Sequence, residues 1–108
     1  MTDKEANDKL YAKMTAEQDK YRKWLLSLPP QEILNHAYEY CVREDVMCSL
    51  EGTDLDGRDA RALLKSPAPL EDIYKDWQKR DPTYMEDIRD TILDRARKNI
   101  QREQEQER

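Results

Sequence analysis

Five prolines divide this sequence into segments whose apolar residues recur at helical spacing, and no other feature restricts the fold as strongly. The prolines lie at positions 29, 30, 67, 69 and 82. A proline pushes the preceding residue out of helical geometry, so helices end before it and can begin at it. Strand signals are almost absent, since the chain has two valines and no convincing alternation of apolar and polar residues. The pattern predicts an all-α fold, a small bundle of about five helices around one core, with a frayed polar C-terminal tail.

The first predicted helix begins near Thr2, which has the spacing of a capping box with Glu5, and ends at Leu28 before Pro29. At 1.5 Å per residue it would be nearly 40 Å long, so we expect its first two or three turns to project or fray. A second capping-box spacing begins at Thr15 and leaves open whether the helix breaks there.

Further helices are expected from Pro30 to Gly52, with Gly52 as a left-handed stop, from Asp56 to Lys65, and after Pro69. The last begins near residues 81–83, with Asp81 or Thr83 as its cap. It carries the most regular apolar stripe, which consists of Met85, Ile88, Ile92, Ala96 and Ile100. We therefore expect one domain over residues 1–100 and a frayed tail over 101–108.

The composition predicts a soluble chain with a thin core. Hydrophobic residues make up 37 % of the 108 residues, and Leu, Ile, Val and Phe together account for only 18. No apolar run is long enough for a membrane span or a secretory signal, so we expect a cytoplasmic protein without a membrane partner. Because so small a core gives marginal stability, a protein partner or a homodimer would stabilise the fold.

Residues that serve cofactors, metals and catalysis are scarce. Two glycines cannot build a phosphate-binding loop, so no nucleotide cofactor is expected. Cys41 and Cys48 would lie about 10 Å apart on one helix, too far for a disulfide, and are expected to be small core residues in a reducing compartment. Their spacing with His36, which we place on a helix flank, does not suit zinc.

The stretch Thr53-Asp54-Leu55-Asp56-Gly57 resembles a calcium loop, but the register leaves Gly52 and Leu63 where calcium needs carboxylates. A turn whose aspartates cap the next helix is the favoured interpretation.

Acidic residues concentrate in the fourth and fifth predicted helices. Residues 71–94 hold 8 acids and 4 bases, and the whole chain has a net charge of -5. Because an acidic surface repels the phosphate backbone, direct nucleic-acid binding is disfavoured. On the last helix, acids and bases three or four positions apart favour a solvated, self-paired face over acid–base catalysis, so no enzyme is expected.

The aromatic residues are all Tyr or Trp, which suit half-buried and interface positions. We expect Tyr21, Trp24, Tyr74 and Trp77 in the core. The candidate interaction surface consists of two tyrosines expected to be exposed and seven acids: Tyr11, Tyr38, Glu71, Asp72, Asp76, Glu86, Asp87, Asp90 and Asp94.

Three stretches carry a resemblance to a known family: LLSLPPQEILNHAYEYCVREDVM (25–47), ALLKSPAPLEDIYKDW (62–77) and MEDIRDTI (85–92). Their order and proline placement resemble a domain-of-unknown-function family of small helical proteins carried by bacterial conjugative and phage-like mobile elements. The likeness covers roughly residues 8–98. It implies a helical fold, a bacterial cytoplasm and a mobile-element setting, and it supplies no site residues.

The leading hypothesis is a non-enzymatic interaction module that acts through its helical surface. The alternative is an anti-defence inhibitor, similar in action to an anti-CRISPR protein, whose acidic helical face blocks a nucleic-acid-binding groove. An enzyme and a DNA-binding accessory protein follow in that order.

Overall fold

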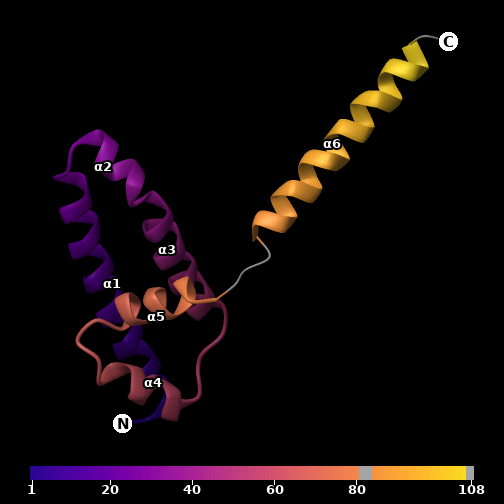
Figure 1. Cartoon of the computed structure of the whole chain (residues 1–108). Coiled ribbons are helices and arrows are strands. Elements are labelled where there is room, and N and C mark those ends of the chain that lie inside the picture. Colours follow the sequence, from indigo (N-terminus) through magenta and orange to yellow (C-terminus); the bar gives the residue numbers. More distant parts are fainter. Residues whose placement is uncertain (81–83, 107–108) are drawn as a thin grey trace.

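The computed structural model describes residues 1–80 and 84–106, and within these ranges the fold is all-α, as predicted. The helices are α1 (Asp3–Leu26), α2 (Pro30–Asn35), α3 (Ala37–Gly52), α4 (Gly57–Leu64), α5 (Pro69–Gln78) and α6 (Tyr84–Gln106). Helices α1 to α5 pack together as a body, and α6 projects from it (Figure 1). Pro30 and Pro69 occupy first-turn positions of α2 and α5, in agreement with the predicted role of the prolines.

The segment from Pro30 to Gly52 forms two helices where the sequence predicted one. His36 ends α2, since its N–H bonds to the carbonyls of Glu32 and Ile33, and it also begins α3, since its carbonyl accepts from the N–H of Tyr40. The His36 ring meets Trp24 edge to face, with centroids 5.1 Å apart. This contact fixes the bend against the end of α1.

Helix α1 is the element against which the body is built. It runs unbroken through Thr15, whose hydroxyl donates to the carbonyl of Tyr11. Ala6, Leu10 and Met14 recur every four residues and are fully buried, at the centre of the apolar core. The expectation that the first turns project or fray is therefore wrong. They are covered because α4 packs against them, and Thr2 caps them by accepting from the N–H of Glu5 at 3.1 Å.

Gly57 explains how α4 comes so close to the N-terminus of α1. A Cβ placed on Gly57 would lie 1.8 Å from Oδ1 of Asp3, which also pairs with Arg61 at 3.2 Å. This glycine permits close packing. Gly52, by contrast, is helical and has no positive φ, so the predicted left-handed stop is wrong. The chain leaves α3 through Thr53 in extended geometry.

Helix α6 departs most from the prediction. None of its described residues is buried, so the stripe from Met85 to Ile100 does not join the core. The helix also continues to Gln106, through most of the segment expected to fray. The predicted caps Asp81 and Thr83 lie outside the described residues. The radius of gyration is 20.2 Å, against ~13 Å for a compact domain of this length.

Both cysteines and both tryptophans are more exposed to solvent than the sequence predicted. Cys41 and Cys48 are free and exposed, because they lie on the side of α3 away from the core. Trp24 and Trp77 are nearly half exposed, whereas Tyr74 is buried as predicted. The core is thin, in line with the composition, and its buried cluster consists of alanine, leucine and methionine side chains.

Because α1 is buried and α6 is exposed, shortening a side chain to alanine is expected to destabilise the fold strongly on α1 and hardly at all on α6. Leu10→Ala removes a fully buried side chain and is expected to lower the free energy of unfolding by about 2–5 kcal/mol. Gln101→Ala, on exposed α6 and on the side away from its apolar stripe, is the matched control and is expected to change it by about 0.5 kcal/mol or less. Urea denaturation followed by circular dichroism measures both. A cost at Gln101 similar to that at Leu10 would contradict the exposed placement of α6.

Candidate interaction surface

The most prominent surface feature is an exposed apolar stripe on α6, made of Met85, Ile88, Ile92, Ala96 and Ile100. Met85 is 71 % exposed and Ile92 is 60 % exposed. At ~100° per residue, the five side chains fall within an arc of about 120°. Such a stripe is typical of a helix that packs against another surface.

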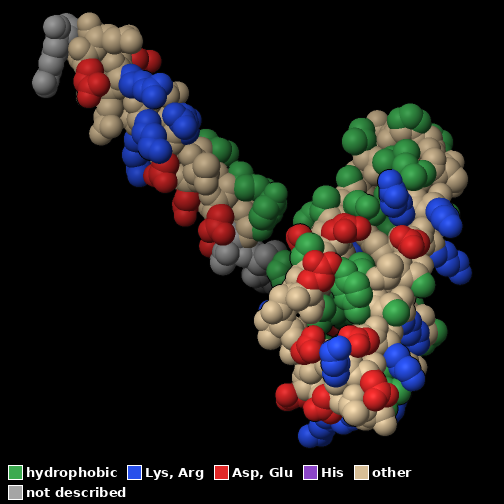
Figure 2. Space-filling view, turned by 180° about the vertical axis from the view of Figure 1, so that it is seen from behind, with side chains coloured by type: hydrophobic (Ala, Val, Ile, Leu, Met, Phe, Trp, Pro, Cys, Tyr) green, Lys and Arg blue, Asp and Glu red, His purple; other side chains and the backbone are tan. Residues whose placement is uncertain are grey.

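Charged residues surround the apolar stripe of α6, and the side opposite the stripe carries aspartates together with Arg97 and Lys98. Arg89, Arg95 and Arg102 lie within or beside the arc of the apolar stripe, at ~100° per residue. The predicted acids of α6, Glu86, Asp87, Asp90 and Asp94, lie outside that arc, and the three aspartates centre on the opposite side of the helix. In Figure 2, hydrophobic side chains lie along one edge of α6, whereas the other edge carries acidic side chains near the body and a cluster of Lys and Arg further along.

The body carries an apolar groove of about 440 Å³, between α3, α4 and α5. Its lining is apolar apart from Asp45 and Ser49, and consists of Met14, Val42, Asp45, Val46, Ser49, Leu50, Leu55, Leu63, Ile73 and Trp77. Figure 2 shows hydrophobic side chains grouped on the body near the base of α6, with acidic side chains around them. The groove and the α6 stripe are both apolar and both in contact with solvent among the described residues.

The predicted acids on α5 are exposed but already interact within the body. Glu71 pairs with Lys75 at 3.4 Å, and Asp72 accepts from the hydroxyl of Ser66 at 2.5 Å. Asp76 is exposed on the same helix. The acids predicted as one face therefore divide between α5, in the body, and α6, which projects from it (Figure 1).

The two predicted tyrosines have different surroundings. Tyr38 is exposed, as expected, and its hydroxyl accepts from the indole N–H of Trp77 at 3.1 Å, beside the apolar groove. Tyr11 is half-buried and packs against the core, so the expectation of an exposed contact is wrong. Its hydroxyl donates to Glu51, and this bond raises the pKa of Tyr11.

A buried arginine joins three helices at the other side of the body. Arg43 of α3 pairs with Glu39 at 2.8 Å and with Glu17 of α1 at 3.7 Å. Its guanidinium stacks over the ring of Tyr21, 4.1 Å from the centroid. Glu17 also accepts from the N–H groups of Leu70 and Glu71, at 2.8 and 2.9 Å. The arrangement satisfies a buried charge and is structural in character.

Burial also raises the pKa of Tyr21 to about 12, and the nearby Glu39 carboxylate adds to this effect. The hydroxyl is buried without a hydrogen-bond partner among the described residues. Because the neutral phenol is favoured in the folded state, its stabilising contribution is complete below pH 10 and is lost as the pH rises through about 12.

We therefore expect the free energy of unfolding of Tyr21→Phe to decrease less at alkaline pH than that of the wild type. The free energy of unfolding of the wild type, relative to Tyr21→Phe, should be constant in neutral solution and fall between pH 10 and about 12. Urea denaturation at a series of pH values measures the difference. A difference that does not change with pH would contradict the assignment.

The described residues contain no group of three or more His, Cys, Asp or Glu side chains that could hold a metal ion, and His36, Cys41 and Cys48 form none. Asp56 occupies the N-cap position of α4 but its side chain makes no capping bond there, so the predicted capping role is wrong. No described helix is both long and apolar enough to cross a membrane.

Neither the groove nor the role of Glu17 was predicted from the sequence. The groove arises where three helices meet, so no single segment signals it. For Glu17, the available signal was that Ala68, which precedes α5, has no side chain able to cap a helix. The missing cap could have suggested an acid from elsewhere in the chain, but not which one.

A family model described as "Protein of unknown function (DUF3848)" matches residues 6–100 of the chain. Because this match spans most of the sequence, the chain belongs to that family. It is therefore a small all-α member of an uncharacterised family, as the resemblance in the sequence implied. No curated protein and no solved structure matches the chain.

Proposed function

We propose that this protein is a non-enzymatic interaction module that binds another protein through the apolar stripe of α6. The observation that carries the proposal is the exposure of that stripe, from Met85 to Ile100, on a helix with no buried described residue. Leaving aliphatic side chains in water is unfavourable by roughly 25 cal/mol per Å² of apolar surface, and a bound partner would remove this cost. Large exposed apolar patches of this kind commonly mark interaction sites.

The shape of α6 supports this proposal further. Its 23 residues exceed the length at which isolated helices become marginal, so it can present its stripe without packing on the body. An amphipathic helix offers anchors at positions i, i+4 and i+8, here Ile88, Ile92 and Ala96, to a groove in a partner.

Site-specific photo-cross-linking tests the proposal. We replace Ile92 with photoreactive benzoylphenylalanine, irradiate cells of the native host and identify adducts by mass spectrometry. The control carries the same residue in place of Gln101, which lies about 180° from Ile92 around α6. We expect protein adducts from position 92 in large excess over position 101. Equal or absent adducts at both positions would refute an interaction through the stripe.

The alternative function uses the opposite face of α6 as an inhibitor of a nucleic-acid-binding protein, of the anti-defence kind. The observation that favours it is the exposed alignment of Asp87, Asp90 and Asp94 on that face. Asp94 pairs with Arg97 at 3.6 Å, and this exposed pair weakens the resemblance of the face to a phosphate backbone.

Neutralisation of this acidic face separates the two functions. If the face occupies a basic groove, Asp87→Asn combined with Asp90→Asn and Asp94→Asn should abolish inhibition of target nucleases and spare the helical circular dichroism signal. Binding of the wild type should also weaken steeply with salt. Binding that is insensitive to both changes would leave only the apolar stripe as the contact.

The setting that we propose is the cytoplasm of a bacterium, with the protein carried by a mobile element. The support for it is the sequence resemblance alone.

A further inference from the structure

We propose that the partner of the α6 stripe is a second copy of this chain, and that two copies exchange their α6 helices, each placing its stripe in the apolar groove of the other. This inference rests on the proposed function and names its partner. The groove, about 440 Å³ between α3, α4 and α5, has the dimensions and apolar lining that suit a few aliphatic side chains.

One chain carries both of the complementary surfaces, so a two-fold arrangement of two copies would cover two stripes and two grooves at once. The groove of the same chain is a poorer partner, because α6 is directed away from the body (Figure 1).

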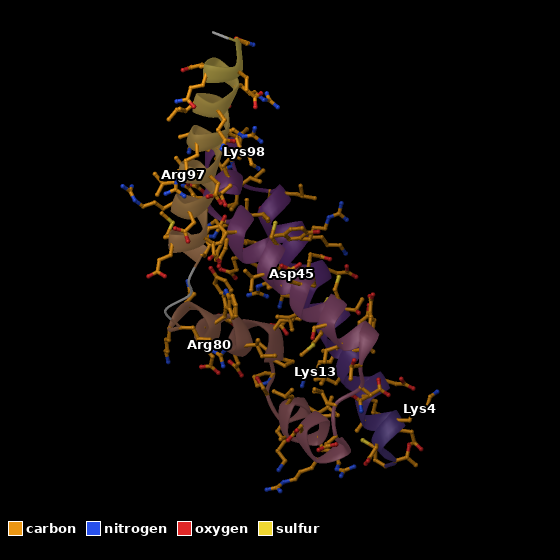
Figure 3. The ribbon with its side chains drawn as sticks, turned by 90° about the vertical axis from the view of Figure 1, so that its right-hand side faces the viewer. Lys4, Lys13, Asp45, Arg80, Arg97 and Lys98 are labelled. Atoms are coloured by element: carbon orange, nitrogen blue, oxygen red, sulfur yellow. The ribbon has the colours of Figure 1, made fainter. Side chains whose placement is uncertain are left out.

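Charges on the two surfaces are complementary. Asp45 is the charged residue of the groove lining, while Arg95 and Arg102 border the α6 stripe. Across residues 1–80 and 84–106, none of these three forms an ion pair. Figure 3 shows the position of Asp45 on α3. An acid in an apolar groove and arginines beside an apolar stripe would favour their association and its register.

The surface area of the chain fits an exchanged dimer. The chain exposes 8741 Å², whereas a compact protein of its mass exposes about 6,300 Å². The difference, roughly 2,400 Å², exceeds the ~800 Å² that each partner contributes to a stable interface of standard size. Burial of part of this surplus on both copies would reach the size range of permanent homodimers.

Two variants that each disable one side of the contact test the exchange. Ile92→Asp places a charge in the stripe, and Val42→Asp places one in the groove. The wild type is expected to be a dimer of twice the 12.9 kDa chain mass at micromolar concentration, by sedimentation velocity and native mass spectrometry. Each variant alone should weaken the dimer at least ~100-fold, because the charge would be buried in both halves of the interface.

Mixing of the two variants is the decisive step. The intact α6 of Val42→Asp fits the intact groove of Ile92→Asp, so an equimolar mixture should form a heterodimer that exceeds both homodimers in native mass spectrometry. Gln101→Asp on the far side of α6 and Cys41→Asp, exposed on α3, are the matched controls and should remain dimeric. Circular dichroism verifies that each variant folds. Should Val42→Asp unfold, Ser49→Arg replaces it, because Ser49 is an exposed residue of the groove.

Three results would overturn the exchange. A wild type that stays monomeric at 100 times the concentration of the assay (on the order of 100 µM) would refute it. So would a mixture without heterodimer, and so would groove variants as dimeric as the wild type, which would indicate pairing of α6 with α6. If position 92 still cross-links to a different protein, the proposed function stands and only the second copy is refuted.

Discussion

The arrangement of the body depends on polar side chains of α1 that bind the backbone of later segments. Asn7 donates to the carbonyl of Leu55 at 2.8 Å and accepts from its N–H at 2.9 Å. Nearly two turns further on, Lys13 donates to the carbonyl of Leu64 at 2.9 Å, at the end of α4. Glu17 then accepts from the first N–H groups of α5. A cation at a helix C-terminus and an anion at a helix N-terminus both suit the helix dipole, so one face of α1 satisfies two opposite helix ends.

These hydrogen bonds from α1 determine which apolar side chains come into contact. The hydrogen bonds fix α4 and α5 over Leu10 and Met14, which gives a small chain a fully buried centre. Arg43 extends the same network to α3, where its charge is satisfied by two carboxylates and an aromatic ring. The groove is what remains between α3, α4 and α5 once these contacts are made. The body is therefore held by long-range polar contacts around a thin apolar core.

The helices were predictable to the extent that local chemistry determines them. Proline positions marked the ends of α1 and the starts of α2 and α5, and Thr2 marked the cap of α1, because these effects act within one turn. The bend at His36 was not predictable, since it depends on the distant ring of Trp24. The α6 stripe was correctly located in the sequence, but periodicity reports that a face is apolar and does not report what covers it. The candidate acidic residues could be identified because acids are concentrated in one part of the sequence. The groove could not, because it exists only once three helices are packed together.

The long sequence separation of the α1 contacts has a consequence for synthesis of the chain. Helix α1 is made first, yet the groups that Asn7, Lys13 and Glu17 hold lie at residues 55, 64, 70 and 71. While the ribosome adds the intervening residues, α3 becomes available to pack against α1, but the segments that Asn7, Lys13 and Glu17 bind are still missing. Local helices form quickly, whereas contacts between distant parts of a chain must wait for loop closure. Assembly of the body is thus completed only after α5 has emerged from the ribosome.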